Sequence, residues 1–438
     1  MMFSFLAITL ICFFEIRRVS ISFFTSAIAA VFIAIYIVSA LYFIWLLLAV
    51  SIIYFHVFIL ISIGLVTFLR IEKYKSVIHN LSVSVSFSSL IFFALLIGFM
   101  PKFSAHISMW GRWDAIAIWN LHAKFLFSEN SWSDYLLSNM EWSHPDYPLF
   151  LPASIAYFWK AIGNISATVP FLISLFFTFS IPIVLHDSLP QKSLFQKLLA
   201  IFLPLLLCYN DTYLKWMLSQ MADAPLALGI LLALVYFNQF FRNKSTQALI
   251  LASFIAFVIL WIKNEALLFT LSFMAILIIH RYFSFQFRRG YFISTIFILH
   301  AFFLPLYFKL HFAPQNDLYV ATSFEAFILK LFDATRYKVI GNYGLQTLIE
   351  SQFWLLLFIP FLIIVFRSNL FTLIKLPTAQ LLLLLTIFYF FIYVVTPKDL
   401  NWHLETSLIR LLVQIIPAWL FVLSGISLLQ KDKQQVIS

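Results

Sequence analysis

The sequence predicts an all-α polytopic membrane protein. Of its 438 residues, 63% are hydrophobic and only 11% are charged, whereas a soluble domain carries roughly 25% charged residues. Long apolar runs recur along the whole chain. Only helices and closed barrels satisfy the backbone in lipid, and barrel strands are short and alternating, so these runs indicate helices. Cys12 and Cys208 lie in apolar runs, so no disulfide framework is predicted.

The apolar runs divide into candidate membrane segments. A spanning helix needs roughly 20 apolar residues, which gives about thirteen crossings. A further run at 149–162 is too short to cross and is predicted to form a partial helix. The candidate segments are 2–16, 20–43, 46–69, 81–101, 165–186, 198–210, 222–241, 247–262, 266–280, 291–308, 352–366, 378–396 and 409–429.

The cations indicate an orientation. Lys and Arg favour the cytoplasmic side of a membrane, and one threading places every basic loop there: 17–18, 70–75, 192–197, 242–244, 281–289, 367–375 and 431–433. The net charge of +10 therefore does not predict nucleic-acid binding. The loops left outside are 102–148, 211–221, 263–265, 309–351 and 397–408, and they hold nearly all candidate catalytic groups.

The first outer loop, 102–148, is amphipathic and rich in tryptophan, which anchors a segment at a membrane surface. Asp114 in this loop could be a general base, or the N-cap of an amphipathic helix at 115–127. At the end of the loop, three prolines stiffen residues 144–152. They could hold His144 and Asp146 toward a bound headgroup, or simply return the chain to the membrane.

Two later polar positions can likewise be interpreted either as structural or as part of a site. Asp223 precedes a long apolar helix, where it is either a helix start or part of a site. The sequence Lys263-Asn264-Glu265 separates two short apolar segments, and a hairpin turn explains it, although three strongly polar residues exceed what a turn requires.

The clearest physical signal lies near the C-terminus. His403, Ser407, Arg410 and Gln414 have the spacing of one helical stripe, which enters an apolar helix from the outer surface. An arginine within a membrane helix costs about 2.5–3.5 kcal/mol on insertion scales, so Arg410 needs an anionic partner. That partner is either a lipid phosphate or a carboxylate elsewhere in the bundle.

The chain has no phosphate-binding glycine loop, HExxH motif or GxSxG motif. Its motifs instead resemble the GT-C superfamily of membrane glycosyltransferases, which includes the protein O-mannosyltransferases and the aminoarabinose transferases of lipid A. In those families the first outer loop carries a catalytic acidic pair, commonly Asp-Glu, where this chain has Asp114-Ala115. Their His-Pro-Pro-Leu segment matches the run from His144 to Leu149, which has two inserted residues.

The chain is also similar to a group of uncharacterised bacterial membrane proteins. They share patterns such as WDAxAIWNxKAxFL, HPDYPLLLP, KNEG and WHLxTSxxRLLxQ. This chain has WDAIAIWNLHAKFL, HPDYPLFLP, KNEA and WHLETSLIRLLVQ, and the resemblance covers roughly residues 110–415. Residues 1–80 would then be additional membrane segments of unknown role, 81–430 a GT-C-like catalytic domain and 431–438 a cytoplasmic tail.

The resemblance implies transfer of a sugar from a polyprenyl-phosphate donor to an envelope glycan, lipid or protein. The reaction would take place on the outer, periplasmic face of a bacterial inner membrane, among membrane lipids. No cofactor is obligatory, although some relatives use a divalent metal, which Asp114 and Asp223 would share. Asp114 would be the base; Arg410, Lys263 and His403 would bind the donor phosphate; Asp146, His144, Asp223, Glu265 and Lys124 would position the substrates.

Two other classes are compatible with the sequence. An O-antigen polymerase or ligase would place essential residues in the late outer loop 309–351, which holds Lys330, Arg336 and Lys338. A non-enzymatic lipid or solute transporter would carry charges deep in several helices, and this chain shows few.

Overall fold

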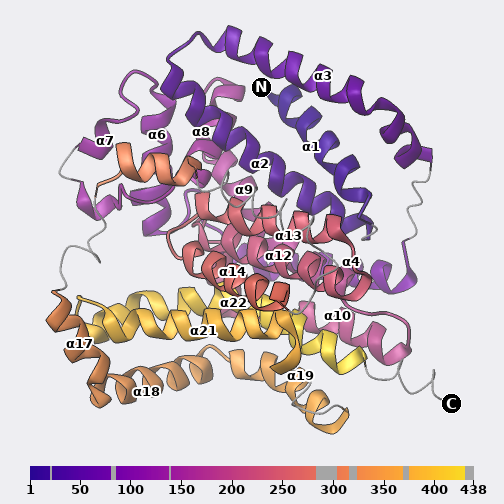
Figure 1. Ribbon diagram of the computed structural model, residues 1–438, viewed down its shortest axis with the longest axis vertical. Coiled ribbons are helices and arrows are strands. Elements are labelled where there is room, and N and C mark those ends of the chain that lie inside the picture. Colours follow the sequence, from indigo (N-terminus) through magenta and orange to yellow (C-terminus); the bar gives the residue numbers. More distant parts are fainter. Residues whose placement is uncertain are drawn as a thin grey trace.

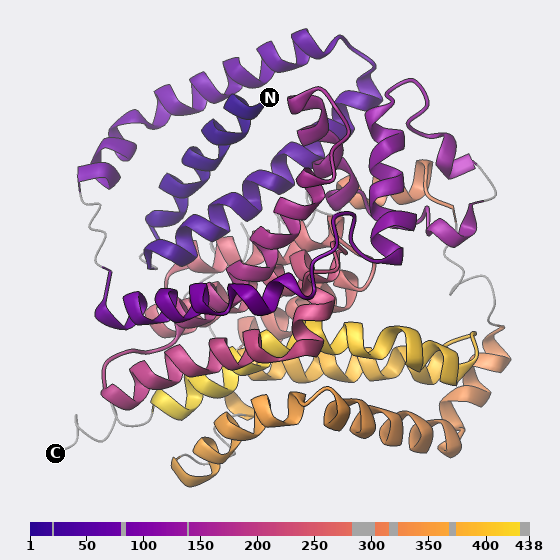
Figure 2. The same ribbon diagram turned by 180° about the vertical axis from the view of Figure 1, so that it is seen from behind.

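The computed structural model of the protein describes residues 1–19, 22–79, 85–137, 140–282, 303–314, 323–367 and 374–429. These residues form helices joined by turns and contain no strand, so the predicted all-α class is confirmed (Figures 1 and 2). The helices are α1 (Met2–Arg17), α2 (Phe23–Leu48), α3 (Ile52–His79), α4 (Phe87–Gly98), α5 (Met100–Ser104), η1 (Ala115–Asn120), α6 (Leu121–Phe127), α7 (Asp134–Leu137), η2 (Glu141–Ser143), α8 (Phe150–Ile162), α9 (Thr168–Ser188), α10 (Leu194–Tyr209), α11 (Asp211–Met217), α12 (Asp223–Asn243), α13 (Thr246–Val258), η3 (Ile259–Trp261), α14 (Ala266–Tyr282), α17 (Phe324–Phe332), α18 (Ala334–Glu350), α19 (Phe353–Arg367), α21 (Pro377–Val395) and α22 (Leu400–Leu429).

The chain is an integral membrane protein, but the structure does not confirm about thirteen crossings. Within the described residues, six helices are long and apolar enough to span, or eight if each of two bent helix pairs counts as one span. The six are α2, α3, α9, α12, α21 and the stretch Leu400–Gly425 of α22; the bent pairs are α10 with α11 and α18 with α19. The predicted segment 291–308 and the tail 431–438 lie largely or wholly outside the described residues.

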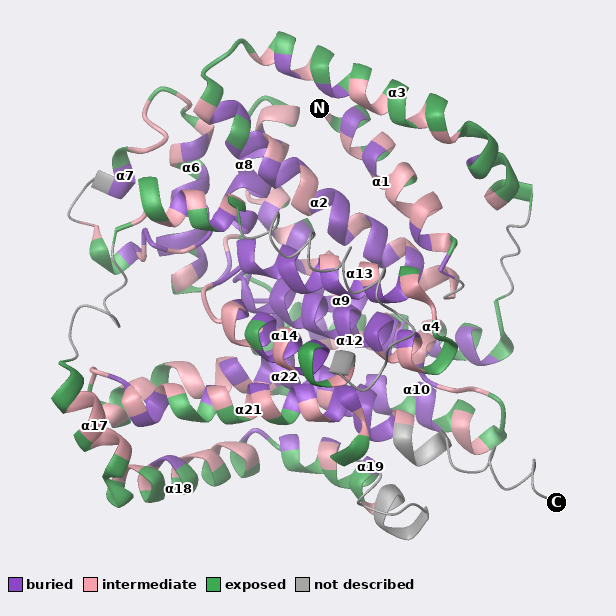
Figure 3. Cartoon of the chain, viewed as in Figure 1, coloured by how far each residue is buried: buried purple, intermediate pink, exposed green. Residues whose placement is uncertain are grey.

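Burial within the protein accounts for the apolar character of some predicted segments that are too short to span a membrane. The α13 helix has only 13 residues, or roughly 20 Å at 1.5 Å per residue, and a hydrocarbon core is roughly 30 Å thick. Its residues are apolar because they are buried against α12, as the purple colouring in Figure 3 shows. The α3 helix, by contrast, is mostly exposed on the periphery. Hydropathy alone does not distinguish burial in protein from burial in lipid.

The α12 helix forms the centre of the bundle. It packs against α9, α13 and α22, and nearly all its residues are buried. Gly229 allows this close packing, because a Cβ atom there would collide with Ile259 and press on Phe32. Through this core, residues from α2, α12 and the α13 region are held in fixed relative positions.

The bundle has two chemically distinct ends. The N-terminus of α12, the C-terminus of α21 and the N-terminus of α22 share one end, where Asp223 and Arg410 meet. At the opposite end, Arg242, Thr378 and Gly425 line a small hollow. Asp223 and Arg410 therefore lie at one end of the bundle, and Arg242 lies at the other.

A helical hairpin brings a third polar segment to the first end. The Thr270 hydroxyl donates to the Ala256 carbonyl at 2.7 Å, so the start of α14 packs beside the end of α13. The turn between them holds residues 263–265, as the hairpin interpretation predicted. The α22 helix begins at Leu400, nine residues before the predicted segment 409–429, so Arg410 lies well inside the helix.

Candidate functional site

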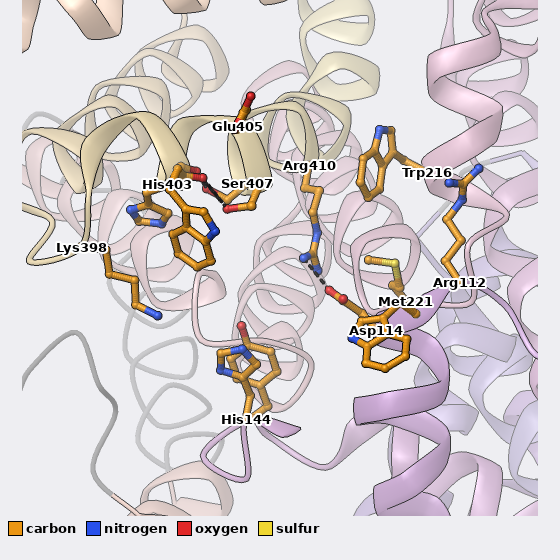
Figure 4. Close-up of a pocket in the computed structure, with 14 residues that line it drawn as sticks. Arg112, Asp114, His144, Trp216, Met221, Lys398, His403, Glu405, Ser407 and Arg410 are labelled. Atoms are coloured by element: carbon orange, nitrogen blue, oxygen red, sulfur yellow. Dashed lines mark hydrogen bonds and ion pairs between the residues drawn. The ribbon is translucent and has the colours of Figure 1, made fainter. Parts of the chain in front are cut away.

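Arg410 of α22 joins two carboxylates that are far apart in the sequence. Its Nη1 donates to Asp114 Oδ2 at 2.8 Å, while Nε and Nη2 both donate to Asp223 Oδ2 at 3.2 Å. Figure 4 shows the Asp114 carboxylate and the Arg410 guanidinium facing one another. The bundle thus supplies the anionic partners that an arginine in a membrane helix needs.

Asp223 is the buried centre of this arrangement. Its side chain is 0% exposed, and besides Arg410 its carboxylate accepts from Lys263 Nζ at 3.0 Å and from Gln414 Nε2 at 2.5 Å. Lys263 also contacts Glu265 Oε1 at 2.9 Å. We call Asp114, Arg410, Asp223, Lys263 and Glu265 the ion network. Full pairing is what buried charges require, because an unpaired one is strongly destabilising.

The predicted stripe on α22 faces α21 and α12. His403 Nδ1 lies 2.9 Å from Thr396 Oγ1, and Ser407 Oγ lies 2.8 Å from the Tyr393 hydroxyl. Gln414 accepts from the Tyr389 hydroxyl at 2.8 Å as well as donating to Asp223. The i, i+4, i+7, i+11 spacing therefore predicted one polar face correctly.

The helix-cap interpretation of Asp114 is wrong. Asp114 precedes η1, which is a π-helix, but its side chain makes no capping hydrogen bond and binds Arg410 instead. The residue before α12 is Ala222, and the Asp223 carboxylate binds the three side chains named above rather than the helix's own amides. Short π-helical turns recur at functional sites, and here one follows directly on the partly exposed carboxylate.

The proline-stiffened loop is anchored from two sides. Asn264 Nδ2 donates to Asp146 Oδ2 at 2.7 Å, and Lys309 Nζ lies 3.4 Å from the same oxygen. His144 has a left-handed backbone with φ of 49°. The Tyr147 ring stacks against His144 and Trp119, at centroid distances of 4.9 and 5.4 Å. This loop is therefore rigid, and the hairpin turn that supplies Lys263 also supplies one of its anchors.

A cavity of about 540 Å³ opens beside the ion network. Five of the residues singled out from the sequence line it: Asp114, His144, His403, Ser407 and Arg410. The remaining lining residues are Arg112, Trp113, Tyr147, Trp216, Met221, Lys398, Trp402, Glu405 and Thr406. Figure 4 shows that the loop carrying His144 faces α22 across this cavity.

The other predicted residues take different places. Asp223, Lys263 and Glu265 do not line the cavity and belong to the ion network. Asp146 likewise does not line the cavity, and its carboxylate anchors the proline-stiffened loop. Lys124 is not brought to the site, and its ammonium lies 5.6 Å from the Trp110 ring centroid.

Most cavity residues beyond the predicted ones had a weak signal or none. Arg112 and Trp113 directly precede Asp114, and Trp402 directly precedes His403. Their closeness in sequence to a candidate residue was the only indication that they belong to the site. Trp216 and Met221 follow the 72° bend between α10 and α11, which the sequence does not reveal.

The guanidinium of Arg410 occupies the position between Asp114 and Asp223 that a shared divalent ion would need. Within the described residues, no group of three or more His, Cys, Asp and Glu side chains is arranged to hold a metal. A positive charge between the two carboxylates is therefore supplied by the chain itself.

Two cations of the late outer loop have a structural role. Lys330 Nζ donates to the Thr396 carbonyl at 2.8 Å. Arg336 donates to the Val394 and Tyr393 carbonyls at 2.9 and 3.0 Å. Cations at a helix C-terminus stabilise its unpaired carbonyls, so Lys330 and Arg336 cap α21 rather than line the cavity.

Chemically, the site combines a partly exposed carboxylate, several cations and a set of aromatic rings at one end of a membrane bundle. Trp113 and Trp402 are 76% and 50% exposed, and aromatic faces of this kind can pack on sugar rings or lipid chains. No protein-family model, no curated protein and no solved structure matches this chain at a significant level.

Proposed function

We propose that the protein is a glycosyltransferase that moves a sugar from a polyprenyl-phosphate donor to a cell-envelope glycan, lipid or protein. The cavity would face the periplasm of a bacterial inner membrane, in keeping with the position of basic residues such as Arg242 at the opposite end of the bundle. Its cations suit a phosphate, its aromatic rings suit a sugar and a lipid chain, and its volume of about 540 Å³ suits a headgroup-sized ligand.

One observation carries the proposal, and it is the unequal pairing of Arg410. Asp223 is fully buried and binds Arg410 through Nε and Nη2, so it fixes the guanidinium. Asp114 binds only Nη1 and its side chain is 29% exposed, at the wall of the cavity. A phosphate oxygen can therefore reach Nη1 by competing with a solvated carboxylate, while the buried pair stays intact.

In the proposed reaction, the released Asp114 carboxylate accepts the proton of an acceptor hydroxyl. The acceptor oxygen forms a bond to the anomeric carbon as the bond from that carbon to the phosphate oxygen breaks. The electron pair of the broken bond stays on the phosphate, which leaves as polyprenyl phosphate. Arg410, Lys398 and His403 line the cavity, and in this proposal they balance the charge that develops on the phosphate.

The test is turnover by the purified protein in liposomes. The donors would be the glucose, mannose and 4-amino-4-deoxyarabinose esters of undecaprenyl phosphate, with an envelope extract as acceptor and with and without Mg²⁺. We expect release of undecaprenyl phosphate, and Asp114→Asn should slow it by about 10²–10⁴-fold. The matched control is Asp211→Asn, since that side chain is 72% exposed and does not line the cavity.

Two results would contradict the proposal. If no donor is consumed under any of these conditions, the protein is not this kind of transferase. If Asp114→Asn turns over as fast as the wild type, Asp114 is only a partner of Arg410 and some other group is the base.

A further inference from the structure

Tyr147 is a cavity residue to which the reaction above gives no role. It lies in the proline-stiffened loop, and its ring is held between those of His144 and Trp119, with interplanar angles of 10° and 22°. Its backbone N–H donates to the His144 carbonyl at 3.0 Å. Ring and backbone are thus fixed in one orientation, so the position of the hydroxyl is set before any ligand binds.

The hydroxyl of Tyr147 is a hydrogen-bond donor with no recipient in the described chain. No described residue forms a hydrogen bond with it, and Tyr147 is a half-buried residue that lines the cavity. Burial raises the pKa of the Tyr147 phenol well above its usual range, and the Glu265 carboxylate adds to that effect. The group therefore stays a neutral O–H donor at physiological pH.

The charges that act on this phenol are mostly negative. They belong to Glu265, Asp146 and Asp114, while the Arg410 guanidinium acts in the opposite direction. Each of these carboxylates already pairs with a cation, namely Lys263, Lys309 or Arg410. The Tyr147 phenol is therefore a neutral donor at the cavity wall, and a neutral sugar hydroxyl can accept its hydrogen bond.

The cavity thus has two sides with different preferences. Lys398 and His403 lie near the N-terminus of α22, and Figure 4 shows them across the cavity from the loop that carries His144. An anionic headgroup belongs on the side of Lys398 and His403. A polyhydroxylated, uncharged group attached to it would extend toward Tyr147.

We propose that the Tyr147 hydroxyl donates a hydrogen bond to a hydroxyl group of the transferred sugar. This inference rests on the proposed function and assigns the sugar-recognising side of its cavity. Tyr147 would then determine how tightly the sugar portion of the donor is held, and would not affect affinity for the lipid phosphate.

The experiment compares ligand affinities of wild type and Tyr147→Phe, which keeps the ring and its stacking. The probes are undecaprenyl phosphate and its glucose, mannose and 4-amino-4-deoxyarabinose esters, titrated into the purified protein. We expect at least one sugar ester to bind the wild type more tightly than the bare lipid. Tyr147→Phe should weaken binding of that sugar ester by about 3–10-fold, the effect of one neutral hydrogen bond, and should leave the affinity for the bare lipid unchanged.

The control is Tyr135→Phe, a fully buried tyrosine stacked on His122 outside the cavity, which should change neither affinity. If Tyr147→Phe lowered the affinities for the sugar ester and for the bare lipid equally, the phenol would contact the phosphate, and the inference would be overturned. Wild-type affinity for the sugar ester in that variant, or no sugar ester binding better than the bare lipid, would overturn it as well. If the wild type binds none of the four probes, the proposed function itself fails, and the sugar subsite fails with it.

Discussion

Replacing Arg410 with methionine tests whether the ion network supports the fold as well as the site. Methionine keeps much of the side chain's length and apolar contact but removes every hydrogen bond to Asp114 and Asp223. If Arg410 served only a lipid phosphate, the variant would fold as well as the wild type or better, because a costly membrane charge is gone. The observed pairing predicts the opposite.

The size of the effect follows from what each partner loses. Removing one member of a buried ion pair typically costs about 3–5 kcal/mol, because the other charge is left uncompensated. Asp223 keeps Lys263 and Gln414 after the change, and Asp114 is 29% exposed and can be hydrated. We therefore expect the low end of the range, about 3 kcal/mol, or roughly 150-fold in the unfolding equilibrium.

The assay is equilibrium unfolding of the purified protein in detergent or lipid, followed by tryptophan fluorescence. Arg18→Met is the matched control, since Arg18 pairs with Glu15 at 3.0 Å and both side chains are more than a third exposed. Such a surface pair is worth about 0–1 kcal/mol. Equal stability of wild type and Arg410→Met would refute the reasoning and leave ligand binding as the only role of Arg410.

Four further outcomes are expected. Asp223→Asn should destabilise the fold by about 3–5 kcal/mol, measured in the same unfolding assay, because two buried cations lose their shared carboxylate. Lys398→Ala should weaken binding of undecaprenyl phosphate while leaving the unfolding equilibrium unchanged, since Lys398 lines the cavity outside the ion network. Burial lowers the pKa of His122 to about 3 from its ordinary 6.5, so the folded state resists protonation of this side chain. The free energy of unfolding should therefore fall as pH drops below about 6.5, by roughly 2 kcal/mol at pH 5. A His122→Gln variant that lost as much stability as the wild type between these pH values would contradict this. In a cysteine-free background of intact cells, Asn130→Cys should react with an impermeant thiol reagent and Asn243→Cys should not, and the reverse pattern would invert the orientation.

The sequence was most informative where a helical spacing of polar residues coincided with a charge that is unfavourable in a membrane helix. The α22 stripe was predictable because a helix places i, i+4, i+7 and i+11 on one face, and because Arg410 in an apolar helix demands an anion. Which anion it finds was not predictable. Asp114 lies 296 residues earlier in the chain, and a pairing over that separation depends on how the first outer loop packs beside α22 rather than on any local pattern.

The same limit explains the other departures. Lys263 was predicted to bind the donor phosphate and Glu265 to position the substrates, yet Lys263 forms ion pairs with both Glu265 and Asp223. A turn sequence reveals polarity but not whether its side chains point into a neighbouring helix. The structure does not confirm the crossing count, and apolar residues by themselves indicate only that water is excluded. The α13 helix is largely buried against protein, whereas α3 is mostly exposed on the outside of the bundle.

The structural and the binding roles of Arg410 are compatible because its two carboxylates differ. Asp223 is fully buried and binds two donor atoms of the guanidinium, so it fixes the orientation of Arg410 whether or not a ligand is present. Asp114 is partly exposed and binds the remaining donor on the cavity side. Exchange of that carboxylate for a phosphate replaces one anion by another on a preoriented donor, so little ordering is lost on binding. The same exchange frees the carboxylate proposed as the base, and thereby couples occupation of the phosphate position to activation of the acceptor.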